Sequence, residues 1–264
     1  MDLQLTGKRA VVSGGSKGIG LAVARTLAAE GADVVISARG EEVTEVANAL
    51  AAESGRRVLG IRADTNDDSA VRAMVEQAVS ELGGVDILVN TAATPWSADK
   101  NVSTIETTDD LMRGEFETKV LGYLRTARAV VPYMTAQGWG RIINISGLAA
   151  RNAGSAAQTF RNISVSAITK NLADELGPQG VNVTVVHPGM TRTSAFTARL
   201  IAQAEAEGTT VAELEKSLAK NTVRRIIDAS ELADVVAFLA SPRSIAITGD
   251  AIAAGGGVPG PIYY

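Results

Sequence analysis

The stretch that decides the fold is SGGSKGIG, residues 13–20. It continues the apolar run Arg9–Ser13 and leads into a helix-like segment, so its glycines fall on a strand-to-helix turn. Gly14, Gly18 and Gly20 form the pattern G-x-x-x-G-x-G. Glycines let such a turn tighten and approach a pyrophosphate, whose charge is met by free N–H groups at the helix N-terminus. The turn therefore predicts a dinucleotide site, and the alternative is a glycine-rich turn with no ligand.

Short apolar, β-branched runs recur along the chain, and helix-like segments separate them. Fully apolar runs such as DVVIS and DILVN suit strands that are covered on both faces of a sheet. Their alternation predicts an α/β, doubly wound parallel sheet of about seven strands with right-handed crossovers. No linker or repeat is visible, so we expect a single domain over residues 1–264. The expected strands are Arg9–Ser13, Asp33–Ala38, Arg57–Ile61, Val85–Asn90, Gly140–Ser146, Val181–His187 and Ile245–Ala254, and the expected helices are Ile19–Ala29, Glu41–Glu53, Asp68–Leu82, Asp109–Ala136, Ala157–Leu176 and Ser230–Ala240.

One long segment between the sixth expected strand and the last helix breaks this alternation. It includes TSAFTARLIAQAEAEGTTVAELEKSLAKN, whose pattern predicts one or two amphipathic helices. Ligands bind at the carboxyl edge of such sheets, so we expect a helical substrate lid over residues 194–225. The alternative is a helical decoration or a contact between subunits.

Composition excludes several functional classes. The net charge of −4 and the lack of a basic cluster argue against nucleic acid as the main partner. The chain has no cysteine, so it has no disulfide, thiolate nucleophile or cysteine-ligated metal, and no His/Asp/Glu cluster has metal-ligand spacing. No signal peptide is visible, and no apolar run approaches the ~18–20 residues of a membrane span. We therefore expect a soluble, cytoplasmic protein without a metal or a membrane partner.

The end of the second expected strand bears on the choice of dinucleotide. An acidic residue there would hold the adenosine ribose hydroxyls and repel an added phosphate. In DVVISARG the corresponding position is Ala38, followed by Arg39, and Lys17 lies within the glycine turn. Two cations and no carboxylate favour the 2′-phosphate of NADP(H). The alternative is that Arg39 merely caps a solvated strand end.

Several motifs, in order, resemble those of the short-chain dehydrogenase/reductase family between about Gly7 and Gly257. SGGSKGIG resembles the family's TGxxxGxG turn, RADTND its adenine-contacting aspartate, and NTAA its NNAG motif. NIS ends on Ser146, which matches the carbonyl-binding serine, and HPGMTRT resembles the segment whose threonine reaches the nicotinamide amide. ITGDAIAAGGG resembles the last strand of the family.

The resemblance implies a Rossmann-type fold and an NADP(H)-dependent oxidoreductase acting on a small molecule. It also implies a homo-oligomer, either a homo-dimer or a homo-tetramer built on the long helices. Carried over position by position, the cofactor-binding residues are Gly14, Ser16, Lys17, Gly18, Ile19, Gly20, Arg39, Asp64, Thr65, Asn90, Ala92, Pro188, Gly189 and Thr193.

The chain departs from the family at the catalytic residues. The family works with Asn, Ser, Tyr and Lys, the last two spaced as YxxxK, and no YxxxK occurs here. Counting back from HPG places Gln158 at the tyrosine and Asn162 at the lysine. Counting forward from Ser146 would place Thr159 at the tyrosine, so the first alignment requires a one-residue deletion in the intervening loop. We adopt it because the helix and the next strand then align without a gap. The family's asparagine falls on Lys119, and only Ser146 is retained.

The replaced residues raise the question of what supplies a proton. Gln158 and Asn162 are four positions apart, so on a helix they share one face, which we expect to point into the cofactor cleft. Amides hold hydroxyls and carbonyls but cannot act as general acids, a role whose loss typically forfeits ~10²–10⁴ in rate. We expect the opposite, sheet-facing side of this helix to be covered by Phe160, Ile163, Leu172 and Leu176.

Three answers remain open. Lys119 extends its ammonium into the vacated region and donates the proton, or it belongs to a structural hydrogen-bond or ion-pair network. Alternatively, the substrate is an iminium or activated double bond that needs little acid, and Ser146 and Gln158 orient it. The third answer is non-redox chemistry of lyase, hydratase or isomerase type, or a pseudoenzyme that binds NADP. We favour NADPH-dependent reduction of an imine or an activated C=C or C=O group, in which Asn162 holds the nicotinamide ribose.

Other candidate residues have more ordinary interpretations. His187, the only histidine, is interpreted as a packing residue before Pro188. Arg151 and Arg161 flank the catalytic stretch and could recognise an anionic substrate, or they are surface arginines. Trp96 and Tyr123 could line an apolar substrate pocket, or they belong to the core.

Overall fold

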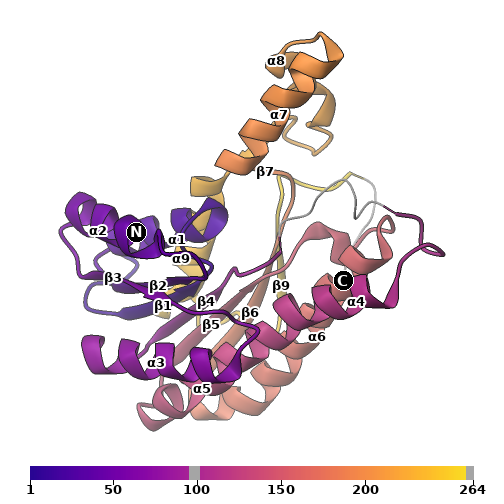
Figure 1. Ribbon diagram of the computed structural model, residues 1–264. Helices are drawn as coiled ribbons and strands as arrows, with labels where there is room; N and C mark the ends of the chain where they lie inside the picture. Colours follow the sequence, from indigo (N-terminus) through magenta and orange to yellow (C-terminus); the bar gives the residue numbers. More distant parts are fainter. Residues whose placement is uncertain (95–101, 260–264) are drawn as a thin grey trace.

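A seven-stranded parallel sheet forms the centre of the molecule (Figure 1). The computed structural model describes residues 1–94 and 102–259. The strand order is β3-β2-β1-β4-β5-β6-β9, so the chain crosses from the edge strand β3 back to β4, beside β1. Ligands bind at such a reversal of strand order, at the carboxyl ends of the strands. The strands are β1 Arg9–Ser13, β2 Asp33–Ala38, β3 Val58–Arg62, β4 Ile87–Asn90, β5 Gly140–Ile145, β6 Val181–Pro188 and β9 Ala251–Ala254.

The sequence predicts these strands well except for the last one. The strand expected over Ile245–Ala254 is shorter in the structure, where only Ala251–Ala254 pair with β6. Gly249 has a φ of +73°, which breaks the extended run before the strand begins. Part of the apolar stretch is therefore a turn, and Ile245 is exposed.

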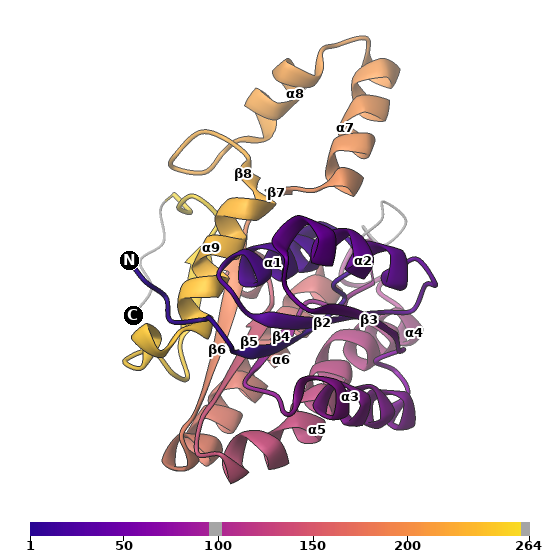
Figure 2. The same cartoon turned by 90° about the vertical axis from the view of Figure 1, so that its left-hand side faces the viewer.

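Helices cover both faces of the sheet, as Figure 2 shows from the side. The apolar clusters assign three helices to each face. This three-layer arrangement confirms the predicted doubly wound fold. One face is covered by α1 Gly18–Ala29, α2 Val43–Ser54 and α9 Ala229–Ala240, and the other by α3 Asp68–Leu82, α5 Gly122–Ala136 and α6 Ala156–Leu176.

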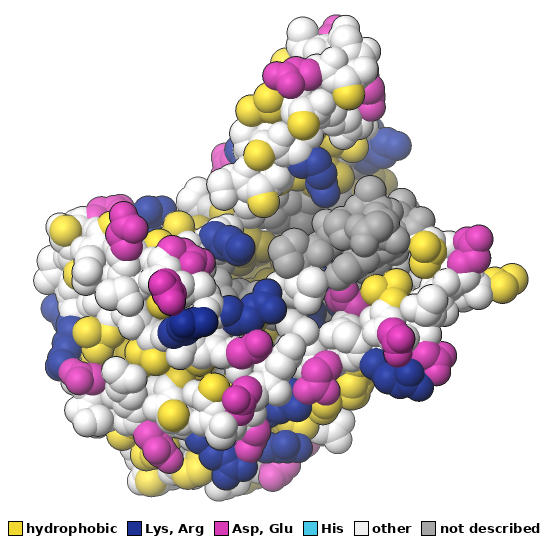
Figure 3. All heavy atoms as spheres, in the orientation of Figure 1, with side chains coloured by type: hydrophobic (Ala, Val, Ile, Leu, Met, Phe, Trp, Pro, Cys, Tyr) yellow, Lys and Arg dark blue, Asp and Glu magenta, His cyan; other side chains and the backbone are white. Residues whose placement is uncertain are grey.

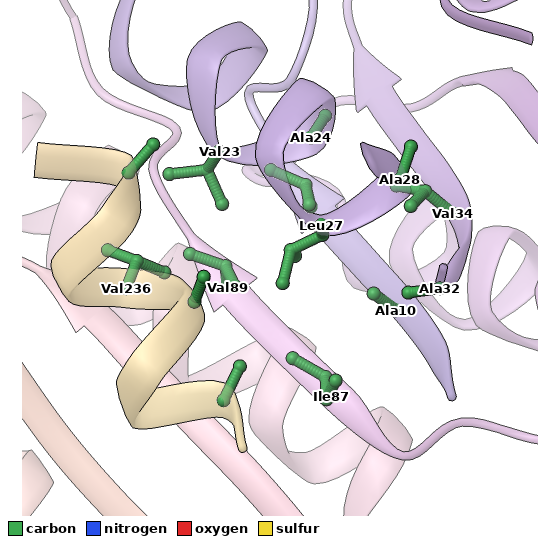
Figure 4. Close-up of a cluster of buried hydrophobic side chains, with 14 of the residues drawn as sticks. Ala10, Val23, Ala24, Leu27, Ala28, Ala32, Val34, Ile87, Val89 and Val236 are labelled. Carbon is green, nitrogen blue, oxygen red and sulfur yellow. The ribbon is translucent and has the colours of Figure 1, made fainter. Parts of the chain in front are cut away.

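The core between α1, α9 and the sheet explains why these segments pack as they do (Figure 4). Val23 and Leu27 of α1 meet Val236 of α9 above Ile87 and Val89 of β4, and all five are fully buried. Burying one such side chain contributes about 1.5–3 kcal/mol. The core thus holds α1 against β1 and β4, and with it the glycine turn that precedes α1.

The long helix expected over Asp109–Ala136 is continuous but not uniform. It consists of α4 Asp109–Glu115, a π-helical stretch η2 Phe116–Leu121, and α5. Such wide turns are rare and frequently occur at functional sites. Lys119 lies in this stretch and is buried.

The inserted segment folds as two helices that stand clear of the body, α7 Ser194–Glu207 and α8 Val211–Leu218 (Figures 1 and 2). At its foot, β7 Thr191–Arg192 pairs with β8 Ile227–Asp228. The two helices share a small apolar cluster of their own, centred on Phe196, Leu200 and Leu214. The amphipathic sequence pattern therefore predicted the two helices correctly. That they act as a substrate lid stays a proposal.

The expectation for the buried side of α6 is partly wrong. Phe160 and Ile163 are 43 % and 49 % exposed, whereas Arg161 and Asn162 are buried. The inward face of this end of α6 is polar because it meets Lys119 and other polar groups rather than an apolar layer. An apolar stripe therefore does not identify that face.

Two further observations bear on the sequence predictions. Within residues 1–94 and 102–259, no helix has the length and apolar character of a membrane span. Tyr123 is a core residue, 1 % exposed, and its hydroxyl donates to the Ile145 carbonyl at 2.9 Å. Trp96 lies outside the described residues.

Candidate active site

A cleft of about 330 Å³ opens at the carboxyl ends of β1, β2 and β4. Figure 3 shows the molecule hollowed at this edge of the sheet, at the foot of α7 and α8, with Lys and Arg side chains beside the hollow. Most of the predicted cofactor residues line the cleft. They are Gly14, Ser16, Lys17, Ile19, Gly20, Arg39, Asp64, Thr65, Ala92 and Thr193.

The glycine turn is packed too closely for a side chain at Gly14 or Gly20. A Cβ on Gly20 would lie 2.3 Å from the Gly14 carbonyl oxygen, and Gly14 itself has a φ of +74°. The N–H groups of Gly14 and Gly15 donate to the Ser37 carbonyl at 2.8 and 3.0 Å, which fixes the turn to β2. Helix α1 begins at Gly18, and its N-cap Lys17 makes no side-chain cap bond. Its first N–H groups are therefore available to an anion, and this cradle fits a pyrophosphate.

The adenosine end of the cleft carries mixed charge. Lys17 and Arg39 line it, as predicted, but so does Glu42, which the sequence analysis missed. The Arg62 side chain donates to the Arg39 carbonyl at 2.8 Å and steadies the loop after β2. The signal for Glu42 was weak because it lies beyond the strand end and belongs to no motif.

The remaining cofactor predictions lie outside the lining of this cleft. Asn90 is buried among β1, β4, β5 and α5, where its side chain accepts from Ser13 and Thr126 and donates to Asn144. Gly18 is next to Thr193, since a Cβ there would meet Thr193 Cγ2 at 3.5 Å. Pro188 is the last residue of β6, and Gly189, which follows it, borders a second cavity of about 220 Å³ beneath α8.

Thr91 is a further lining residue that the sequence analysis missed. Its hydroxyl donates to the Ser13 carbonyl at 2.6 Å, and it contacts the glycine turn. It occupies the second position of NTAA, where the chain departs from the family motif, so the motif assigns no role to this residue.

Three of the four predicted catalytic residues form one hydrogen-bonded cluster. Lys119 Nζ donates to the Ser146 carbonyl at 2.9 Å and to Asn162 Oδ1 at 3.1 Å. Ser146 Oγ lies 3.0 Å from the Asn162 carbonyl and 3.3 Å from Asn162 Oδ1. All three are at most 6 % exposed. Gln158 is half-buried, and its side chain makes no hydrogen bond within the described part of the chain.

The cluster adjoins the cleft rather than lining it. Thr118 and Ile145, the residues before Lys119 and Ser146, both line the cleft. The carboxyl end of β5 therefore brings the serine to the cleft wall, and the wide turn η2 brings the lysine behind it. Sequence analysis identified the members of the cluster but not the direct bond between Lys119 and Asn162.

Burial dominates the charge state of Lys119. Desolvation lowers its pKa well below the ordinary value, the nearby Arg161 guanidinium lowers it further, and Glu115 acts in the opposite direction. Among the described residues the lysine makes no ion pair, and both its acceptors are neutral oxygens. A lysine in this setting can change its protonation state during a reaction.

Comparison with known proteins agrees with this geometry. The family model described as enoyl-(acyl carrier protein) reductase matches residues 14–259. The short-chain reductase protein NovJ of Streptomyces niveus is 36 % identical over 251 residues, which cover 95 % of this chain and 93 % of that protein. Dehydrogenase/reductase SDR family member 4 of Oryctolagus cuniculus is 33 % identical, with 97 % and 95 % covered. The chain belongs to the short-chain dehydrogenase/reductase family.

A solved structure extends the likeness to the whole fold. L-sorbose reductase from Gluconobacter frateurii, complexed with NADPH and L-sorbose, superposes with a TM-score of 0.91 at 32 % identity, covering 97 % of this chain and 98 % of that one. The predicted fold is thereby confirmed, as is the prediction that this member of the short-chain dehydrogenase/reductase family is an oxidoreductase enzyme.

His187 in this short-chain dehydrogenase/reductase is a buried neutral residue. It is 2 % exposed, and burial lowers its pKa to about 4, with Arg151 and Lys119 contributing in the same direction. Its Nε2 lies 3.5 Å from Ser166 Oγ. Within residues 1–94 and 102–259, no group of three or more His, Asp and Glu side chains could hold a metal ion.

The two flanking arginines have different environments. Arg161 is buried and donates to Glu115, which is also buried. Arg151 donates to the Ala251 carbonyl at 3.0 Å from the loop after β5. Arg161 is therefore not the surface residue that one interpretation of the sequence expected, and its buried partner was not foreseen.

Proposed function

We propose that this short-chain dehydrogenase/reductase uses NADPH to reduce a small organic substrate, with an imine or an activated C=C or C=O group favoured. The observation that carries the proposal is the buried Lys119–Asn162–Ser146 cluster beside a cleft that fits a dinucleotide. Lys17 and Arg39 in that cleft support NADP(H) over NAD(H), as does the NADPH named for the L-sorbose reductase.

Lys119 would replace the missing tyrosine as the proton source. An ammonium has three donors, and two of the three in Lys119 are used by the Ser146 carbonyl and Asn162 Oδ1. The third proton would pass to the oxygen, nitrogen or carbon of the substrate that becomes basic as its neighbour is reduced. The lowered pKa of Lys119 makes the neutral amine an accessible product of this step.

The other three residues of the site would bind the substrate and the cofactor and orient them. Ser146 and Gln158 would hold the acceptor group, and the Asn162 amide nitrogen would reach the nicotinamide ribose while its oxygen anchors Lys119. Bound NADPH would supply the hydride and be oxidised to NADP⁺ as the acceptor carbon is reduced. Orientation in the cleft would then provide much of the rate, as expected where the acid is unconventional.

We further propose that α7 and α8 act as a substrate lid and that the chain forms a homo-dimer or homo-tetramer. The lid is supported by the place of these helices at the carboxyl edge of the sheet. The oligomer is supported by the exposed Phe160 and Ile163 on α6, since such apolar side chains are commonly covered by a second subunit. Light scattering of the protein in solution measures the oligomeric state.

The test follows oxidation of NADPH while the protein meets ketones, imines and activated alkenes, with wild type beside Lys119→Met. We expect Lys119→Met to lower kcat by ~10²–10⁴ while the dissociation constant for NADPH stays the same, because the lysine serves the proton and not the cofactor. Lys170→Met is the matched control, since Lys170 is an exposed lysine on α6 that pairs with Asp174.

Other outcomes would redirect the assignment. Turnover that is equal in wild type and Lys119→Met would indicate a substrate that needs no protein acid. Tight NADPH binding without oxidation across the panel would favour the second candidate, a non-redox enzyme or an NADP-binding pseudoenzyme. The observation behind that candidate is that Gln158, the residue aligned with the family's tyrosine, has an amide side chain, which cannot act as a general acid.

A further inference from the structure

A buried ion pair lies beside Lys119 and takes no part in the steps above. Arg161 of α6 donates from its guanidinium to Glu115, the last residue of α4. The two side chains are only 9 % and 3 % exposed. Burial removes both charges from water, at a cost that their mutual attraction offsets only with good geometry, so stability alone is a weak reason for the pair.

The pair separates a carboxylate from the lysine. Glu115 precedes Lys119 by four residues, a spacing at which glutamate and lysine ordinarily attract each other along a helix. Here the Glu115 carboxylate accepts from Arg161 instead. Lys119 is left with two neutral acceptors, the Ser146 carbonyl and Asn162 Oδ1, and forms no ion pair with any described residue.

The other ionisable groups near Lys119 do not change charge in the neutral range. His187 faces it from β6 with a pKa lowered to about 4 by burial. Tyr123, one turn further along in α5, has its pKa raised by burial. Arg151, from the loop after β5, acts on His187. Glu115 and Arg161 are therefore the charges that bear most directly on the lysine.

We propose that Arg161 and Glu115 are positioning residues that set the protonation state of Lys119. Arg161 withholds the Glu115 carboxylate from the lysine and adds a nearby positive charge, so the ammonium releases its proton more readily. Glu115 limits this effect and keeps the amine able to recover a proton from solvent after product leaves. The consequence for turnover rests on the proposed function, while the electrostatic relation itself does not.

The test is a pH titration of Lys119 in the full chain labelled with [¹³Cε]lysine and followed by NMR, with the signal assigned by its loss in Lys119→Met. Glu115→Gln removes the negative charge that favours the ammonium and keeps the positive charge of Arg161, so we expect the titration midpoint to move to lower pH. Arg161→Met removes a positive charge near the lysine and keeps the Glu115 carboxylate, so we expect the midpoint to move to higher pH. If Lys119 is the proton donor, the alkaline limb of kcat against pH moves in the same two directions.

Two further variants guard against loss of folding. Arg161→Lys keeps the charge and should restore most of the wild-type midpoint, whereas a merely structural arginine would not be rescued in this readout. The double variant Glu115→Gln with Arg161→Met removes both charges of the pair, so its midpoint should fall between those of the single variants. Asp109→Asn is the matched control, because it removes a carboxylate from the same helix in an exposed pair with Arg113.

Midpoints that stay fixed in both single variants, or that move in the same direction, would overturn the proposal. Failure of the proposed function gives a different result. In that case Lys119→Met retains turnover, and the NMR midpoints still respond to Glu115→Gln and Arg161→Met as stated.

Discussion

The glycine turn and the Lys119 cluster lie at the same edge of one sheet, yet they are built in opposite ways. The turn is formed by backbone, with no room for a Cβ at Gly20 and with free N–H groups at the start of α1. The cluster is formed by buried polar side chains, Lys119, Ser146 and Asn162, that satisfy one another. Gly14 and Gly20 leave no room for a side chain, whereas a cluster of buried polar side chains requires only that each member finds its hydrogen-bond partners.

This contrast indicates which part of such a fold can change its chemistry. A backbone cradle serves any dinucleotide in the same way, because it recognises a pyrophosphate and not a reaction. The proton source is a matter of which side chain can change its charge in a buried place. The alignment that we propose, with Asn162 at the family's lysine position and Lys119 at its asparagine position, would correspond to one positive charge moved to a neighbouring helix.

The largest expected effect is on the turn. Gly20→Ala places a methyl group against the Gly14 carbonyl and the Thr91 hydroxyl, so the turn must open. We expect NADPH affinity to fall by about 1,000-fold, equivalent to about 4 kcal/mol, in a fluorescence titration. Gly177→Ala is the control, because a Cβ there meets nothing within 4 Å. Equal affinities of the two variants would show that the turn does not hold the cofactor.

The next largest effect concerns the buried His187 and appears in the pH dependence of the stability of the fold. His187 has a folded pKa of about 4 against an ordinary 6.5, so below pH 6.5 the unfolded state binds more protons. Stability is therefore full above pH 6.5 and declines as the pH falls towards 4, by about 3 kcal/mol. Urea unfolding of His187→Leu between pH 4 and 7 should lack this part of the slope. A variant with the wild-type slope would assign the acid sensitivity to other groups.

A smaller effect tests whether the backbone cradle or the side chains select the cofactor. Arg39→Ala removes an exposed cation from the adenosine end while leaving the glycine turn intact. We expect NADPH to bind ~10-fold more weakly and NADH to be nearly unaffected, since a charged hydrogen bond is worth about 1.5–3 kcal/mol before solvent screening. Affinity for NADPH that does not change would return Arg39 to the role of a strand-end cap.

The smallest effect is expected at the foot of the two projecting helices. Arg192 pairs with Glu215 of α8 and, at 2.8 Å, with Asp228. Arg192→Met should cost about 1 kcal/mol, as expected for a partly exposed network, and raise KM more than it lowers kcat. Thermal unfolding measures the loss of stability, and steady-state kinetics measures the changes in KM and kcat. A change in kcat alone would place Arg192 in the chemistry.

The sequence predicted the cofactor half of the fold more fully than the catalytic half. β1, β2 and α3 have the predicted bounds because apolar alternation and glycine turns are local signals. Phe160 and Ile163 were assigned to the wrong side of α6 because the rule that apolar residues face inward fails where the inner layer is polar. Which residues share a face was predictable, but which face is buried was not.

In the candidate site, too, the cofactor-binding residues were predictable and the surroundings of Lys119 were not. Gly14, Gly20, Lys17 and Arg39 could be placed in the cleft from motif and strand end. The Glu115–Arg161 pair could not be found, because its members are 46 positions apart and only the packing of α4 on α6 brings them together. The wide turn at Lys119 was equally invisible, since a π-helical stretch has no sequence signature of its own.

The pairing of β7 with β8 has a consequence for how such a protein acquires new substrates. Because Thr191 lies opposite Ile227, the chain leaves and re-enters the body at neighbouring points. Everything between those points can be lengthened, shortened or exchanged without changing the distance that the connection must span, and long insertions at such places are thermodynamically cheap. The segment that carries the projecting helices can therefore be exchanged as a unit. Replacing residues 193–226 with the corresponding segment of a relative offers a route to a different substrate range while the cofactor site stays unaltered.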